Sequence, residues 1–95
     1  PIAGTASIGL GEGIDLSGWD LPYTDLELQW LENADFRGAN LSHARLTESN
    51  LVGADFTSAI LPNTDMRFVY VRGASFAHAK LVIGISMANS IQPIL

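Results

Sequence analysis

The chain has 95 residues, 47% of them hydrophobic, and contains no cysteine. This length allows one domain at most, and the lack of cysteine excludes disulfides and thiolate metal sites while leaving the redox compartment open. The formal net charge of -5 argues against direct binding to nucleic acid or to an anionic membrane surface, because both recruit basic surfaces. No apolar run approaches the roughly 20 residues of a membrane-spanning helix. We therefore expect neither a nucleic-acid partner nor a membrane span.

Residues 1–13 are rich in glycine, and we expect them to form an N-terminal leader or cap. They contain no charged region followed by an apolar one, so a signal peptide is either absent or already removed. The compartment stays open, and we expect the cytoplasm rather than export.

From Leu16 onward, every fifth residue is large and apolar. This predicted core ladder comprises Leu16, Leu21, Leu26, Leu31, Phe36, Leu41, Leu46, Leu51, Phe56, Leu61, Met66, Val71, Phe76 and Leu81. From Ala34 onward, the residue two positions before each ladder residue is small or β-branched. The chain thus repeats a unit of five residues.

A period of five fits neither of the regular secondary structures. On an α-helix, five residues rotate each successive side chain by roughly 140°, so that no single face collects them. On a flat strand, side chains five residues apart point to opposite faces. We therefore predict a backbone that turns a corner once per repeat and coils around its own core.

The phenylalanines indicate how many repeats complete one coil. Phe36, Phe56 and Phe76 lie twenty residues apart, which corresponds to four repeats. Stacking residues twenty apart predicts a four-sided coil with about 4.8 Å between successive turns. The repeats then fill about 3.5 coils and form a rod roughly 17 Å long.

Several of the units carry a family resemblance. The segments ADFRG at 34–38, ANLSH at 39–43, SNLVG at 49–53 and ADFTS at 54–58 resemble the A(D/N)LxX unit of the pentapeptide-repeat family. The match is strong over 34–81 and weak over 14–33. The resemblance implies an all-β fold, a right-handed quadrilateral parallel β-helix, which we assign to 14–83 with regular repeats from 34.

The first coil departs from this pattern. Ile14, Trp19, Thr24 and Gln29 occupy the small-residue position, and three of these side chains are too large for it. We therefore expect the first coil to be irregular or to act as a cap.

The last segment, 84–95, is apolar and loses the five-residue period. An open solenoid end needs a cover, so this segment is expected to cap the last coil. Two alternatives remain open, because an apolar tail also suits self-association of two C-terminal ends or docking onto the rest of a longer protein.

Two sets of outward positions are candidate binding surfaces. A candidate partner surface gathers Leu28, Trp30, Val52, Phe68 and Tyr70, and it is either an interface for another protein or covered by the terminal segments. A candidate acidic stripe gathers Asp15, Asp35 and Asp55 at intervals of twenty. Its carboxylates either accept hydrogen bonds from the corner backbone or present negative charge to a basic partner.

The sequence offers no convincing catalytic or metal-binding set. His43 and His78 are separated by 35 residues, which is not a multiple of twenty, so they do not stack. No serine, histidine and aspartate map to one side of the coil, and a rod without a concave pocket suits catalysis poorly. We therefore expect no enzyme activity, catalytic residue, cofactor or metal.

The function that these patterns favour is a non-enzymatic scaffold or protein-interaction module, alone or as part of a larger assembly. Its partner would be another protein or, through the C-terminal end, a second copy of the chain. The family resemblance implies one alternative, an acidic DNA mimic that binds type II topoisomerase and protects it from quinolones. The acidic stripe would then imitate the phosphate backbone.

Overall fold

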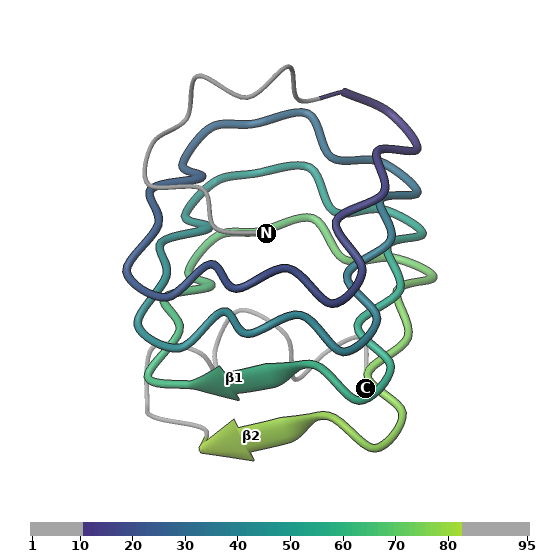
Figure 1. The fold of residues 1–95 in the computed structure, drawn as a ribbon. Helices are drawn as coiled ribbons and strands as arrows, with labels where there is room; N and C mark the ends of the chain where they lie inside the picture. The colour runs from purple at the N-terminus through teal and green to yellow at the C-terminus, as the bar shows by residue number, and fades with distance from the viewer. Residues whose placement is uncertain (1–10, 83–95) are drawn as a thin grey trace.

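The computed structural model describes residues 11–82, which form a four-sided coil with one circuit every twenty residues (Figure 1). Strands β1 (Ile60–Pro62) and β2 (Lys80–Val82) pair in parallel. The other rungs are single parallel bridges between residues twenty apart, such as Asp25 with Arg45. The architecture is a right-handed quadrilateral parallel β-helix of about 3.5 coils, which confirms the predicted fold class.

The corners follow one rule throughout the described residues. At every fifth position from Gly13 to His78 the backbone is left-handed, with φ values between 57° and 73°. At most corners, the N–H of the residue after the left-handed one donates to the carbonyl three residues earlier, as the Ala39 N–H does to the Phe36 carbonyl at 3.0 Å. This hydrogen bond and a positive φ at the third residue are the features of a type II turn. The chain therefore turns once per repeat, as the period requires.

The large residues of the repeat point into the coil and stack on one another. The rings of Phe36 and Phe56 are parallel within 2°, with centroids 4.8 Å apart, and Phe76 continues the stack at 5.0 Å. All predicted ladder residues from Leu16 to Val71 are buried. Phe76 and Leu81 are only partly buried, because they lie in the last described coil.

Two buried hydroxyl groups connect successive coils from the small-residue position. The hydroxyl of Ser49 donates to the Leu26 carbonyl at 2.6 Å and accepts from the Gln29 N–H at 3.0 Å. The hydroxyl of Thr64 donates to the Leu41 carbonyl, also at 2.6 Å. Ser49 and Thr64 therefore bind the preceding coil as well as filling space beside the leucines.

The first coil is regular, so the expectation of an irregular one was wrong, while its alternative role as a cap stays a prediction. The Leu16 N–H donates to the Asp35 carbonyl at 2.8 Å, and the same pattern continues along the coil. Ile14 and Trp19 are partly buried and pack against the core. Among the described residues, only the second coil lies against them, so the small-residue position is less confined here than between two coils.

The predicted terminal segments lie largely outside the described residues. Residues 11–13 already belong to the coil, since the Gly13 N–H donates to the Glu32 carbonyl at 2.8 Å. The capping role of residues 1–10, and the capping or self-association role of 84–95, stay predictions. Within 11–82 the structure contains no helix that is long and apolar enough to span a membrane.

Candidate functional site

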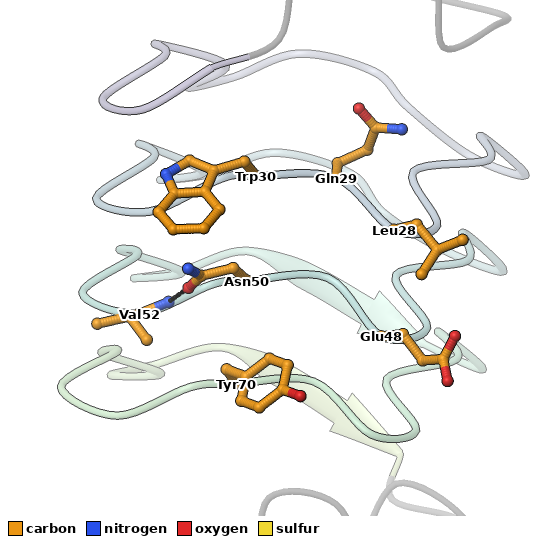
Figure 2. A pocket seen from close by; sticks show the side chains of 7 residues that line it. All are labelled: Leu28, Gln29, Trp30, Glu48, Asn50, Val52 and Tyr70. Carbon is orange, nitrogen blue, oxygen red and sulfur yellow. Dashed lines mark hydrogen bonds between the residues drawn. The ribbon is translucent and has the colours of Figure 1, made fainter.

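One face of the coil carries the exposed aromatic column. Trp30, Asn50 and Tyr70 occupy the middle position of this face in three successive coils and pair in parallel (Figure 2). Each of these residues precedes a buried ladder residue, namely Leu31, Leu51 or Val71, and side chains alternate along an extended segment, so its own side chain points outward. Trp30 is 59% exposed and Tyr70 is 65% exposed. The column of two aromatic residues with an asparagine between them therefore faces solvent.

An open groove of about 440 Å³ lies on this face, which we call the aromatic face. The groove is lined by Leu28, Gln29, Trp30, Glu48, Asn50, Val52 and Tyr70. The Asn50 side chain is fixed at both ends, because its Oδ1 accepts from the Val52 N–H at 3.0 Å and its Nδ2 donates to Glu32 Oε2 at 3.4 Å. The centre of the groove is therefore polar and held in place.

One edge of the groove is a corner column. Leu28 and Glu48 lie one coil apart at this corner, both with left-handed backbone, and Phe68 continues the column in the next coil. Leu28 and Phe68 are both exposed, but Phe68 does not line the groove. Four of the five residues of the candidate partner surface thus border one groove, and the fifth extends its corner.

Three groove residues lie outside the predicted partner surface, namely Gln29, Glu48 and Asn50. Glu48 and Asn50 follow Leu28 and Trp30 by twenty residues, so the spacing that defines the columns was sufficient to find them. The predicted partner surface contains only apolar and aromatic side chains, and these three are polar.

The three carboxylates of the acidic stripe each stabilise a corner. Asp15, Asp35 and Asp55 stack through parallel bridges. Each accepts a hydrogen bond at 2.9 to 3.0 Å from the backbone N–H two residues later. A short polar side chain that bonds the backbone two residues on is a common way to stabilise a turn. The contacts of the stripe are therefore those of the first interpretation, in which the carboxylates accept hydrogen bonds from the corner backbone.

The middle of the stripe is also neutralised. The Arg37 guanidinium donates to both carboxylate oxygens of Asp35, at 2.9 and 2.7 Å, and these bonds hold the pKa of Asp35 below its ordinary value. The hydroxyl of Ser17 donates to Asp15 at 2.6 Å and likewise lowers the pKa of that carboxyl. One guanidinium therefore interrupts the negative charge of the stripe at its middle carboxylate.

Other arginines are paired in the same local manner. Arg45 contacts Glu27 at 2.6 Å and Asp25 at 3.6 Å. Arg67 contacts Asp65 at 2.7 Å, and its hydrogen bonds lower the pKa of the Asp65 carboxyl. The guanidinium groups of Arg45 and Arg67 are therefore already paired with nearby carboxylates.

The histidines lie apart from one another, and both are exposed. The His43 ring stacks on Tyr23, with centroids 4.7 Å apart and planes within 4°. This contact was also missed, although the two residues are twenty apart at the same corner. Among residues 11–82 no group of three or more His, Asp or Glu side chains is placed to hold a metal ion.

The regular corners and ladders agree with a comparison against protein families. The family model described as Pentapeptide repeats matches residues 12–51 and 49–82, in 8 copies. No curated protein matches the chain.

Two solved structures resemble the coil closely. The pentapeptide repeat protein Rfr23 from the cyanobacterium Cyanothece 51142 superposes with a TM-score of 0.72 and 31% identity, over 74% of this chain and 48% of that one. HetL, a pentapeptide repeat protein involved in heterocyst differentiation regulation in Nostoc sp. strain PCC 7120, superposes with a TM-score of 0.70 and 25% identity. That match covers 76% of this chain and 35% of HetL. The chain thus spans about half of one relative and about a third of the other.

Proposed function

Because the chain belongs to the pentapeptide-repeat family, we propose that it is a non-enzymatic protein-interaction module that binds another protein through its aromatic face. Proteins of this family are generally interaction modules and not enzymes. In this chain the module serves as a scaffold, alone or as part of a larger assembly.

The observation that carries the proposal is the exposed pair Trp30 and Tyr70 beside the groove. Tryptophan and tyrosine are enriched at the energetic centres of protein interfaces, where they combine large apolar area with a polar group. Leu28 and Val52 add apolar edges, while Asn50 supplies a fixed polar group. This arrangement of apolar anchors around a polar centre is typical of a binding site.

The acidic DNA mimic is the less favoured candidate. Imitation of a duplex requires a continuous run of negative charge, but Arg37 pairs with Asp35 in the middle of the stripe. A gyrase supercoiling assay tests this alternative. We expect the purified chain to leave supercoiling unchanged, because the stripe is interrupted; inhibition or protection from quinolones would favour the mimic instead.

The test of the interaction proposal is affinity capture from the source cell, with the full chain as bait and mass spectrometry as the readout. The double variant Trp30→Ser, Tyr70→Ser should lose the partner while its circular dichroism spectrum stays unchanged. Tyr23→Ser is the matched control, since Tyr23 is an exposed aromatic residue at a corner that does not border the aromatic face. Undiminished capture by the double variant would refute the role of the aromatic face.

A further inference from the structure

We propose that the groove of the aromatic face binds an arginine side chain presented by a short extended segment of the partner. This inference rests on the proposed function, because it names the chemistry of the partner at the same face. Three features carry it, namely the spacing of the two aromatic rings, the carboxylates beside them and the small area of the face.

The first feature is a notch between two aromatic residues. Trp30 and Tyr70 are two coils apart, roughly 9.6 Å at the usual spacing of paired strands. The shorter Asn50 side chain lies between them (Figure 2). A planar guanidinium binds favourably within about 6 Å of an aromatic centroid. A guanidinium bound over the Asn50 side chain would therefore lie between the Trp30 and Tyr70 side chains and close to both.

The second feature is negative charge without a matching cation. Glu48 lines the groove and makes no ion pair with any residue of the described part of the chain. Glu32 lies on the opposite side of Asn50 and contacts its amide at 3.4 Å. In contrast, Arg37, Arg45 and Arg67 are all paired elsewhere. The two carboxylates beside the groove are thus complementary to a cation from outside.

The exposed guanidinium of Arg72, two residues after Tyr70, allows a second charge variant to test the inference. Arg72 stands at the corner that follows Tyr70, is exposed, and makes no ion pair within residues 11–82. It lies two coils from Glu32 in the same corner column. A cationic ligand in the groove is therefore attracted by Glu48 and Glu32 and repelled by Arg72, so that the two types of variant should act in opposite directions.

The third feature is size. A face of three extended residues is about 10 Å wide, and about 3.5 coils give a length of roughly 17 Å. Its area is far below the roughly 800 Å² per partner of a stable globular interface. A second copy would also bring its own acidic residues to an acidic face. The face therefore suits one short basic segment, and arginine suits it better than lysine because its planar guanidinium both stacks on rings and bridges carboxylates.

The experiment uses the full chain and three capped nine-residue probes. The arginine probe has the sequence Gly-Ser-Gly-Arg-Gly-Arg-Gly-Ser-Gly, and the other two replace both arginines by lysine or by neutral citrulline. Binding is followed by the NMR signal of the Trp30 indole N–H, which is identified by its loss in Trp30→Phe. We expect the arginine probe to shift this signal saturably, the lysine probe to bind several-fold more weakly and the citrulline probe not to bind.

Charge variants test the geometry of the site. Glu48→Gln should weaken the arginine probe about threefold and Arg72→Gln should strengthen it about twofold, in line with single exposed charges. Asp20→Asn is the matched control, because it changes the net charge by the same amount on another face and should have little effect. Equal weakening by Asp20→Asn and Glu48→Gln would overturn the local site.

Two outcomes overturn the inference outright. One is an unshifted Trp30 signal up to about 5 mM arginine probe, a concentration that would largely fill a site with a dissociation constant of about 1 mM. The other is an equal response to the citrulline probe, which would show that charge plays no part. If captured protein still depends on Trp30 and Tyr70 in either case, the proposed function stands and only the arginine chemistry fails. If capture is independent of these residues, the proposed function itself fails.

Discussion

The contact between Gly53 and Asn33 gives a sharp test of how tightly the coils stack at their corners. A Cβ atom added at Gly53 would lie 2.2 Å from Asn33 Oδ1 and 3.3 Å from its Cγ. Gly38 has nearly the same backbone, with φ at 67° compared with 71°, but an added Cβ there meets nothing within 4 Å. The two glycine-to-alanine substitutions therefore differ in one respect, the clash with Asn33.

The expected magnitudes follow from this difference. Alanine in the left-handed region costs roughly 1–2 kcal/mol, and the reduced freedom of the unfolded chain offsets about 0.4–1 kcal/mol of that cost. Gly38→Ala should therefore destabilise the fold by about 1 kcal/mol. Gly53→Ala must also move the Asn33 side chain out of its rotamer, which adds about 1 kcal/mol. For a domain of this size the additional loss lowers Tm by about 4–8 °C.

Thermal and urea unfolding followed by circular dichroism provide the measurement. The double variant Asn33→Ala, Gly53→Ala removes the clashing amide, so the two substitutions should show a favourable coupling of about 1 kcal/mol in a double-mutant cycle. Equal stability of Gly38→Ala and Gly53→Ala, or a cycle without coupling, would refute the close approach of these two corners.

Three further predictions concern the core, a buried hydroxyl and an ion pair. Phe56→Ala removes the central ring of the buried stack and should cost about 3–5 kcal/mol in urea unfolding; a loss below 1 kcal/mol would contradict tight stacking. Ser49→Ala leaves the Leu26 carbonyl without this donor and should lower the free energy of unfolding by about 1–2 kcal/mol, again measured by urea unfolding. An unchanged stability would show that the hydrogen bond is dispensable. Asp65→Asn should cost less than about 1 kcal/mol at pH 7. Because Arg67 lowers the pKa of Asp65, this contribution is present at neutral pH and is lost as the pH falls through the lowered pKa; a cost that does not decrease as the pH is lowered would contradict the ion pair.

The sequence predicted the fold well because the interior of the coil requires a large apolar side chain at every fifth residue. Phe36 and Phe56 are interchangeable in position, since each fills the space between two coils of the same shape. The error at the first coil has the same origin. Trp19 was judged against a slot confined on both sides, whereas among the described residues only one coil presses on it.

The candidate site was predicted less completely, because the contacts of an outward side chain depend on the particular residues around it and not on the five-residue repeat. The column of Trp30 and Tyr70 follows from spacing alone. The pairing of Arg37 with Asp35 does not, because a flexible exposed arginine has several carboxylates within reach. The bond from the Ser49 hydroxyl to the preceding coil was equally hidden, since serine was read there only as a small residue.

Because one circuit takes twenty residues, the position of an outward residue in the sequence determines both its face of the coil and its coil along the rod. An insertion of twenty residues between Trp30 and Tyr70 would lengthen the rod and leave both on one face, only farther apart. An insertion of five would rotate everything beyond it by a quarter turn and carry Tyr70 to the next face. The core would accept either change, because the ladder of large residues continues through both. Relatives of this chain can therefore keep the same kind of interior while changing length in single repeats. Each such change alters which outward residues before and after it share a face.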